Sequence, residues 1–284
     1  MLTIAVQKSG RLSEKTMELF RECGIAFQNG GKGKLKAVAT NFPLEILFLR
    51  DDDIPECVAD GIADAGVVGE NVVYEKDRAV KIARKLGFAR CRLSIAVPKS
   101  WEYESIKDLN GRKIATSFPK ILSEYLQENG VQADIHEING SVEIAPSIGL
   151  ADAIFDIVST GSTLLSNGLK EVETVMQSEA VLITSPNLKP KEKALLKKLT
   201  FRIQAVQRAE NFKYILLNAP NEKIEAISEI LPGMKSPTVM PLALKGWSSV
   251  HSVIKEDDFW EVIEKLKETG AQGILVIPIE KMII

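Results

Sequence analysis

The sequence contains few of the residues on which many metal-binding proteins depend. It has two histidines, His136 and His251, and three cysteines, Cys23, Cys57 and Cys91. A histidine-rich metal site is therefore excluded, and the cysteines lack the close spacing of metal ligands. Three widely separated thiols are typical of small, partly buried residues in a reducing compartment. His136 falls in a predicted strand, where we assign it no function.

Long apolar runs and an excess of charge of either sign are also missing. No run approaches the ~20 residues that span a bilayer. The apolar start, LTIAV at residues 2–6, is too short for the core of a signal peptide. The formal net charge is −2, so there is no basic excess of the kind that marks a dedicated nucleic-acid binder. We therefore expect a cytoplasmic protein that binds neither membrane nor nucleic acid.

The chain does contain a regular alternation of strand-like and helix-like segments. Hydrophobic residues make up 45% of it and charged residues 26%, as in ordinary globular proteins. Through about residue 210 the alternation predicts parallel α/β layers. We expect two lobes with two crossovers, lobe I from residues 1–89 and 184–210 and lobe II from residues 90–183.

From residue 211 to residue 284 the predicted order becomes β-α-β-β-α-β, which is a complete ferredoxin-like unit. About 70 residues suffice for such a small module. Modules of this shape often bind amino acids as regulatory domains, although a fold alone does not fix function.

The residues from Glu143 to Leu164 are the centre of the predicted chemistry. An apolar run that ends at Val158 predicts a buried strand, and the small polar residues 159–163 (STGST) predict a turn into a helix. Helix N-termini attract anions, and Gly161 permits close approach and positive φ. Such a turn suits a phosphate, and Asp156 beside it suits hydroxyls or a cationic centre. An ordinary turn with Ser/Thr capping is the alternative interpretation.

A second turn that suits anions follows the first predicted strand, at residues 2–7. The sequence KSGRL at residues 8–12 places two cations in a glycine turn, before a helix that Ser13 can cap and Gly24 can end. Two solvated surface charges are the alternative. Residues 30–34 (GGKGK) lack the spacing of a phosphate-binding P-loop, so we predict only a loop there.

Three consecutive acids, Asp51-Asp52-Asp53, follow a predicted strand that ends at Arg50. Ahead of a helix they would interact favourably with its dipole. They could also hold Mg²⁺, which prefers carboxylates and water. We favour capping and positioning over direct metal binding.

These motifs resemble those of the ATP phosphoribosyltransferase family in its long form. A specific signature of that family is matched by Glu143, Gly149, Ala151, Ile154, Asp156, Ile157, Thr160, Gly161, Thr163 and Leu164. Further matches are the turn at residues 8–12, the segment 50–71, and residues 231–238 with Gly246-Trp247. The resemblance covers essentially the whole chain.

The resemblance implies a two-lobed, periplasmic-binding-protein-like catalytic part of α/β class, followed by an ACT-like regulatory domain. It also implies a reaction in which N1 of ATP attacks C1 of 5-phosphoribosyl 1-pyrophosphate, with Mg²⁺ as cofactor and no obligatory general base. The implied catalytic residues are Asp156 and Glu143. The implied phosphoribosyl pyrophosphate site is Asp156, Ser159, Thr160, Gly161, Ser162 and Thr163. The implied ATP site is Lys8, Gly10, Arg11, Leu12, Arg50 and Asp51.

The family is the first enzyme of histidine biosynthesis, so the resemblance also implies inhibition by L-histidine. We expect the inhibitor to bind near Ser236, Thr238 and Ala271, between subunits of a homo-oligomer, a dimer or a hexamer.

Two other functions are compatible with the same residues. One is a non-catalytic, two-lobed binding protein for a phosphorylated solute, and the other is a phosphoribosyltransferase that accepts a different base. Two anion-suited turns, one in each lobe, favour two substrates over one solute. The loop of other phosphoribosyltransferases, two acids after four apolar residues, is not clearly present.

Overall fold

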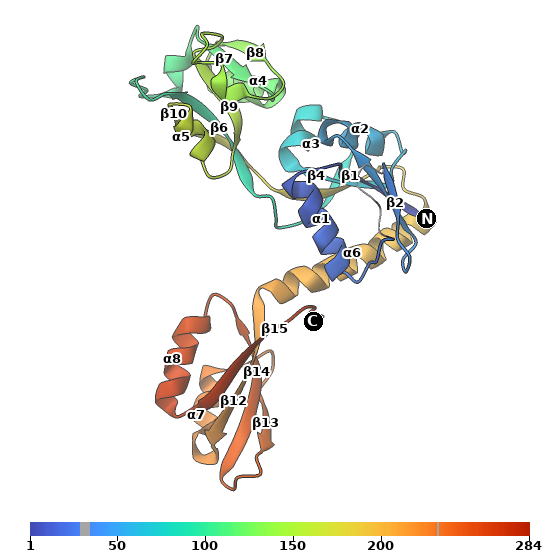
Figure 1. Ribbon diagram of the computed structural model, residues 1–284, viewed down its shortest axis with the longest axis vertical. Coiled ribbons are helices and arrows are strands. Elements are labelled where there is room, and N and C mark those ends of the chain that lie inside the picture. Colours follow the sequence, from blue (N-terminus) through green and yellow to red (C-terminus); the bar gives the residue numbers. More distant parts are fainter. Residues whose placement is uncertain (29–34, 232) are drawn as a thin grey trace. The chain divides into compact units, whose positions relative to one another are not determined.

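The computed structural model describes residues 1–28, 35–231 and 233–284. The described chain forms two compact units, one from residues 1–18 and 25–195 and the other from residues 19–24 and 196–284, and each is described here by itself (Figure 1). The loop predicted at residues 30–34 lies outside the described residues, as does Pro232 of the segment 231–238. No helix in the described ranges is both long and apolar enough to cross a membrane.

The first unit contains two sheets, and the first of them forms lobe I. Its order is β2-β3-β1-β4-β11-β5, and β1 is parallel to both β3 and β4. Strands β1 and β4 lie at the centre of this sheet because they are nearly continuous apolar runs, as strands buried on both faces are. The strands are β1 (Leu2–Gln7), β2 (Lys36–Val38), β3 (Leu44–Leu49), β4 (Ala65–Gly69), β5 (Lys81–Lys85) and β11 (Ala180–Thr184).

Helices α2 (Ile54–Ala59) and α3 (Glu70–Lys76) pack on one face of this sheet, where Ile54 and Val58 join a buried cluster with β-strand residues. Gly66 on β4 makes the close approach of α2 possible. A Cβ atom at that position would lie 2.6 Å from Ile54 Cγ2, a distance that the packed helix could not accept.

Helix α1 (Arg11–Glu22) corrects one sequence prediction. We expected Ser13 to cap it, but Ser13 is a buried residue inside the helix. The helix begins earlier because Gly10 adopts a φ of 93°, and the Gly10 carbonyl already accepts the Glu14 N–H at 3.1 Å. Gly24 ends the helix with a φ of 71°, as predicted.

The second sheet of the first unit forms lobe II, with the order β10-β6-β9-β7-β8. Helix α4 (Pro119–Glu128) packs on one face. The 3-10 turn η3 (Val142–Ile144) and helix α5 (Ser162–Ser166) pack on the other. The strands are β6 (Cys91–Pro98), β7 (Lys113–Thr116), β8 (Asp134–Glu137), β9 (Ala153–Val158) and β10 (Leu169–Ser178); the 3-10 turn η2 (Ile106–Leu109) precedes β7.

The boundary between the lobes differs from our prediction at one strand. We placed the end of lobe II after Ile183, but β11 pairs with β4 and β5 in the sheet of lobe I. Lobe II therefore ends before β11. The reason is that β11 is fully buried on both faces, so its apolar run completes the sheet of lobe I.

A carboxylate of lobe I also caps a helix of lobe II. Glu75 on α3 accepts the backbone N–H groups of Lys120 and Ile121, each at 3.0 Å. The Lys120 ammonium forms an ion pair with Asp77 at 2.8 Å. These contacts join α3 to the first turn of α4.

The long helix α6 (Pro190–Glu210) leads into the last sheet, whose order β13-β14-β12-β15 is antiparallel throughout. This confirms the predicted β-α-β-β-α-β order. Helices α7 and α8 share one buried cluster with the sheet and lie on the same face of it (Figure 1). The elements are β12 (Phe212–Pro220), η4 (Asn221–Lys223), α7 (Ile224–Ile230), β13 (Thr238–Pro241), β14 (Trp247–Lys255), α8 (Phe259–Thr269) and β15 (Gln272–Pro278).

Candidate functional site

The predicted cationic turn lies at the carboxyl edge of the lobe I sheet. Strands β1 and β3 are parallel neighbours in which Gln7 pairs with Leu49, and the Lys8 N–H continues the ladder to the Leu49 carbonyl at 2.8 Å. The register therefore places Lys8 and Arg50 side by side, each as the first residue after its strand. This edge of a parallel α/β sheet is where such folds bind ligands.

The cations at this edge are available to a ligand. Lys8, Arg11 and Arg50 are exposed, and none of the three forms an ion pair with another described residue. Gly10 is exposed and Leu12 is half-buried beside them. Because their charges are not neutralised by the fold, they can neutralise the phosphates of a polyanion.

The three consecutive acids form the 3-10 turn η1 (Asp51–Asp53) ahead of α2. Asp53 occupies the N-cap position of α2, but its side chain makes no capping hydrogen bond. The capping by hydrogen bond that we favoured is therefore wrong, and only the favourable placement at the helix start is confirmed. Asp52 forms an ion pair with Lys76 at 3.3 Å.

The predicted phosphate turn lies in lobe II, at the end of β9. Ser159, Thr160, Ser162 and Thr163 are exposed, and Gly161 adopts a φ of 78° as the N-cap residue of α5. The Thr160 and Ser162 hydroxyls lie 3.0 Å apart. The N-cap residue of α5 is Gly161, which has no side chain to cap the helix, and the Thr160 hydroxyl accepts the Ser162 N–H at the long distance of 3.5 Å, so ordinary capping is weak at this turn. The turn thus presents hydroxyls and helix-start N–H groups to solvent.

Asp156 lies on β9, two residues before the end of that strand, and is half-buried. Its pKa is raised to about 6, chiefly by burial; the Ile157 N–H, donated to Asp156 Oδ1 at 2.7 Å, lowers the pKa, and the nearby negative charge of Glu143 contributes to the rise. The charge of Glu143 is therefore close enough to act on the carboxyl group of Asp156. Around pH 7 the carboxyl of Asp156 is mostly ionised and poorly solvated, which strengthens its interaction with a positive centre.

Sequence reasoning missed the side chains that support this turn. The Arg92 guanidinium on β6 donates to Glu171 through Nε and Nη2, both at 2.5 Å, and to the Ser159 carbonyl through Nη1 at 3.2 Å. Ser94 donates to the same Glu171 carboxylate at 2.7 Å. Arg92 and Glu171 are 79 residues apart, so only the pairing of β6 with β10 could have revealed them.

The described residues hold no cluster of three or more His, Cys, Asp or Glu side chains placed to bind a metal. Mg²⁺ is usually held by one or two carboxylates together with water and substrate phosphates. The half-buried Asp156 beside the phosphate turn fits that lighter requirement. A protein-only magnesium cage does not fit the described chain.

The predicted regulatory residues do not meet within one chain. Ser236 and Thr238 lie at or just before β13, and Ala271 immediately precedes β15, while β13 and β15 are opposite edges of the last sheet. Ala271 lines a cavity of about 510 Å³ with residues of α8 and β15, among them Phe259, Ile263 and Ile274. A site that contains all three predicted residues would require the edges of two copies.

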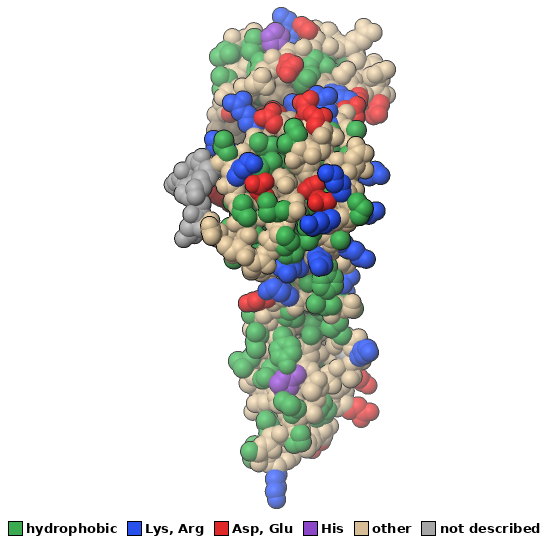
Figure 2. Space-filling view, turned by 90° about the vertical axis from the view of Figure 1, so that its right-hand side faces the viewer, with side chains coloured by type: hydrophobic (Ala, Val, Ile, Leu, Met, Phe, Trp, Pro, Cys, Tyr) green, Lys and Arg blue, Asp and Glu red, His purple; other side chains and the backbone are tan. Residues whose placement is uncertain are grey.

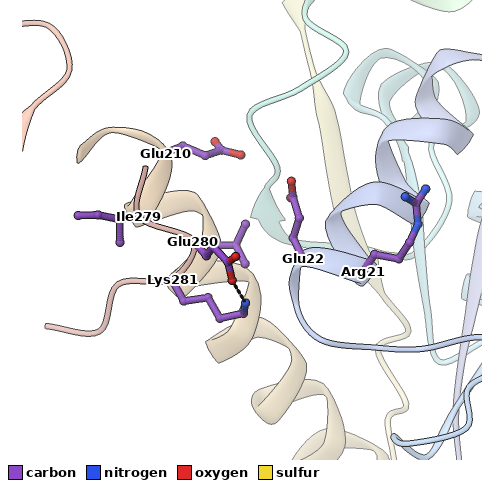
Figure 3. Close-up of a pocket in the computed structure, with 7 residues that line it drawn as sticks. Arg21, Glu22, Glu210, Ile279, Glu280 and Lys281 are labelled. Atoms are coloured by element: carbon purple, nitrogen blue, oxygen red, sulfur yellow. Dashed lines mark hydrogen bonds and ion pairs between the residues drawn. The ribbon is translucent and has the colours of Figure 1, made fainter. Parts of the chain in front are cut away.

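A further cavity of about 480 Å³ lies within the second unit, where the end of α1, the end of α6 and the residues after β15 converge (Figure 3). Its charged lining is mixed, and the Lys281 ammonium lies 3.3 Å from the Glu280 carboxylate. The Met282 N–H, donated to the Ala205 carbonyl at 2.8 Å, attaches this terminal segment to α6. The lining residues are Arg21, Glu22, Val206, Glu210, Ile279, Glu280 and Lys281.

Both acidic and basic side chains are present on the face that Figure 2 shows. The cysteines are free thiols within the described chain, Cys23 buried and Cys57 and Cys91 half-buried. Burial raises the pKa of Cys23 to about 12, so its thiol is not a nucleophile at neutral pH.

Comparison with known proteins gives matches along the whole chain. The family model described as "HisG: ATP phosphoribosyltransferase" matches residues 50–205, and that described as "HisG, C-terminal domain" matches residues 209–281. A curated ATP phosphoribosyltransferase from Cytophaga hutchinsonii is 62% identical over 283 residues, covering 100% of this chain and 99% of the relative. One from Phocaeicola vulgatus is 58% identical over 284 residues, covering all of both.

Two solved structures have a similar fold. The "ATP phosphoribosyl transferase (HisG:HisZ) complex from Thermotoga maritima" matches with a TM-score of 0.61 and 28% identity, over 72% of this chain and 99% of that one. The substrate-binding protein of an amino acid ABC transporter matches with a TM-score of 0.50 and 12% identity, over 74% and 94%. The second likeness concerns the fold alone, and it confirms the two-lobed architecture.

Proposed function

The chain belongs to the ATP phosphoribosyltransferase family, and from this premise we propose how its two anion-suited turns divide the substrates. The reaction is the first step of histidine biosynthesis. The N1 lone pair of adenine forms a bond to C1 of the phosphoribosyl group, the bond from C1 to pyrophosphate breaks, and pyrophosphate leaves with the electron pair. Positive charge develops at C1 as the leaving group departs.

The 5-phosphate of phosphoribosyl pyrophosphate would bind the turn of lobe II. Two features support this assignment: the exposed hydroxyls of Ser159, Thr160, Ser162 and Thr163, and the positive φ of Gly161, which opens the backbone to an anion. No cation lies within this turn itself. Hydrogen bonds from hydroxyls and N–H groups suit a phosphate that must be held without being the centre of reaction.

Asp156, with Glu143 nearby, would face the ribose and its reacting carbon. A poorly solvated carboxylate stabilises positive charge at C1 more than a fully hydrated one does. The raised pKa of about 6 supports this role, because it shows how little solvent reaches the carboxyl group. Adenine N1 is already a usable nucleophile, so no general base is assigned.

The cationic edge of lobe I would hold ATP. Lys8, Arg11 and Arg50 would contact its phosphates or the departing pyrophosphate, and Gly10, Leu12 and Asp51 would shape the loop around the nucleotide. Bound Mg²⁺ would neutralise pyrophosphate oxygens. The protein's share in holding this metal would be small, and Asp156, beside the phosphate turn, is the carboxylate that would contribute to it.

Regulation by L-histidine would use the C-terminal domain. Because Thr238 and Ala271 lie at opposite edges of one sheet, the proposed site joins the β13 edge of one copy to the β15 edge of another. Exposed apolar side chains on β15, among them Leu275 at 56% and Ile277 at 46%, support such a contact. The assembly would be a homo-oligomer, a dimer or a hexamer, working in the cytoplasm.

The observation that carries the proposal is the pairing of a cationic turn in lobe I with a hydroxyl-rich turn and a shielded acid in lobe II. The test incubates the protein with ATP, phosphoribosyl pyrophosphate and Mg²⁺ and follows the absorbance of the N1-modified adenine. We expect turnover only when all three are present. A protein that binds a phosphorylated sugar but never changes the adenine absorbance would instead be the solute-binding alternative.

A further inference from the structure

Arg92 on β6 connects the phosphate turn, which follows β9, to the strand β10 on the other side of β6. Strand β6 lies between β9 and β10, and Arg92 pairs with Val158, the last residue of β9. Its guanidinium therefore stands beside the point where the turn begins. Through Nη1 it donates to the Ser159 carbonyl at 3.2 Å, while Nε and Nη2 hold the two oxygens of Glu171 on β10.

The turn has few fixed contacts of its own. Within it, the Thr160 and Ser162 hydroxyls are 3.0 Å apart, and the Ser162 N–H lies 3.5 Å from Thr160 Oγ1, the limit of a hydrogen bond. The contact from Arg92 to Ser159 thus holds the first residue of a turn whose side chains at residues 159, 160, 162 and 163 are exposed.

Glu171 is itself held in place. Besides the two nitrogens of Arg92, its Oε1 accepts the Ser94 hydroxyl at 2.7 Å and the Thr174 hydroxyl at 3.2 Å. The pKa of Glu171 is lowered to about 2, chiefly by the hydrogen bonds from Arg92, so the carboxylate is charged at neutral pH. A bidentate guanidinium–carboxylate pair fixes orientation as well as distance.

We propose that Arg92, oriented by Glu171, is a positioning residue that fixes the Ser159 carbonyl and so aims the turn's N–H groups and hydroxyls at the sugar phosphate. The inference rests on the proposed function, which assigns this turn to phosphoribosyl pyrophosphate. Arg92 acts through the backbone rather than on the substrate, and Glu171 acts through Arg92.

The test compares Arg92→Met, Arg92→Lys, Glu171→Gln and the double variant Arg92→Met/Glu171→Gln in steady-state kinetics, with each substrate varied in turn. We expect KM for phosphoribosyl pyrophosphate to rise at least fivefold in Arg92→Met and Glu171→Gln, with KM for ATP within twofold of wild type. Arg92→Lys, which keeps the charge but not the bidentate fork, should recover only part of the loss. The double variant should be no worse than Arg92→Met, because both changes break one unit.

Arg112→Met is the matched control. Arg112 lies in the same lobe, 5.0 Å from the Trp101 ring, just before β7. Because β7 and β9 are parallel, this is the opposite end of the sheet from the turn. Its KM values should stay within twofold of wild type. Thermal unfolding of each variant identifies any that fail to fold. In that case Ser94→Ala, which removes one uncharged donor to Glu171, is the milder variant, and we expect it to raise KM for phosphoribosyl pyrophosphate by a smaller factor.

Three results would overturn the inference. Equal rises in both KM values would mean that the pair only supports the fold. A rise in Arg92→Met without one in Glu171→Gln would make Arg92 a direct phosphate ligand. If KM for phosphoribosyl pyrophosphate is unchanged in Arg92→Met and in Glu171→Gln but rises in Thr160→Ala, the positioning role of the pair is rejected and the proposed function stands. If Thr160→Ala has no effect either, the assignment of the turn to the sugar phosphate fails.

Discussion

Ser94 and Asp156 stand directly opposite each other on the antiparallel strands β6 and β9, yet the Ser94 hydroxyl donates to Glu171 and not to Asp156. Asp156 is left with the Ile157 N–H as the hydrogen bond that lowers its pKa. A carboxylate that is shielded from water and given few donors is costly to the fold and useful to a developing cation.

The first prediction concerns the cost of that carboxylate. Its ionised form is disfavoured in the folded state, so the free energy of unfolding declines as pH rises from about 4 to about 6 and stays reduced above that range. We expect Asp156→Asn to be more stable than wild type at pH 8, by at most about 3 kcal/mol at about 1.4 kcal/mol per pKa unit. Thermal unfolding at pH 4.5 and pH 8 measures this. The gain should be much smaller at the lower pH, and a loss of stability at pH 8 would contradict the burial of the charge.

The second prediction concerns turnover. The same Asp156→Asn substitution should lower kcat by roughly 10²-fold or more, a typical effect of removing one group that stabilises charge in the transition state. In the wild type, kcat/KM should fall as pH is lowered through about 6, because protonation removes the charge. A variant that turns over normally, with an unchanged pH profile, would make Asp156 a structural residue only.

The third prediction concerns the phosphate turn. Thr160→Ala removes a hydroxyl next to Gly161, and a lost hydrogen bond to a charged group costs roughly 1.5–3 kcal/mol. Binding of phosphoribosyl pyrophosphate, followed by calorimetry, should therefore weaken by about 10- to 100-fold, while ATP binding changes little. Ser166→Ala, at the other end of α5, where the hydroxyl donates to the Thr163 carbonyl at 2.9 Å, is the control and should bind both substrates as wild type does.

The fourth prediction concerns the cap between the lobes. Glu75 accepts two N–H groups at the start of α4, so Glu75→Ala should lower the free energy of unfolding by about 1–2 kcal/mol. Glu124→Ala is the comparison, because Glu124 forms an exposed ion pair with Lys120 at 3.6 Å, a contact of about 0.5 kcal/mol or less. Denaturant unfolding of the two variants should separate them, and equal effects would mean that the cap contributes no more than a surface charge.

The fifth prediction concerns regulation. Ser236→Ala/Thr238→Ala should weaken L-histidine binding and inhibition without changing the uninhibited rate, since the coupling between two such sites is typically about 1–3 kcal/mol. The control is Thr269→Ala, at a half-buried residue at the end of α8 whose hydroxyl donates to the Lys265 carbonyl at 2.8 Å. Calorimetry and inhibition kinetics provide the readout. Unchanged histidine affinity in the double variant, or direct competition with phosphoribosyl pyrophosphate in the wild type, would reject this location.

Strand positions were predictable wherever an apolar run was bounded by polar or small residues. The structure confirms the predicted strand at residues 2–7 and the strand that ends at Val158, since a short apolar run bounded by turn residues is typical of a buried strand. It also brings Lys8 and Arg50 to one edge, as parallel strands require. The start of α1 was missed because the left-handed φ of Gly10, and not the hydroxyl of Ser13, sets that helix boundary.

Contacts that depend on strand register could not be predicted. The pair of Arg92 and Glu171 needs both the adjacency of β6 and β10 and the irregular register next to Glu171. The separation of Thr238 from Ala271 likewise follows from the order β13-β14-β12-β15, which is invisible in a linear list of strands. Sequence motifs supplied the candidate site residues, whereas the contacts between Arg92 and Glu171 appeared only with the fold.

The position of β11 has a consequence for the order in which the protein can form during synthesis. This strand lies between β4 and β5, and β5 has no other pairing partner among the described strands. When residues 1–89 have been synthesised, the pairing partner of β5 is still missing, because β11 follows the whole of lobe II in the chain. We therefore expect the sheet of lobe I to be completed only after lobe II has been synthesised.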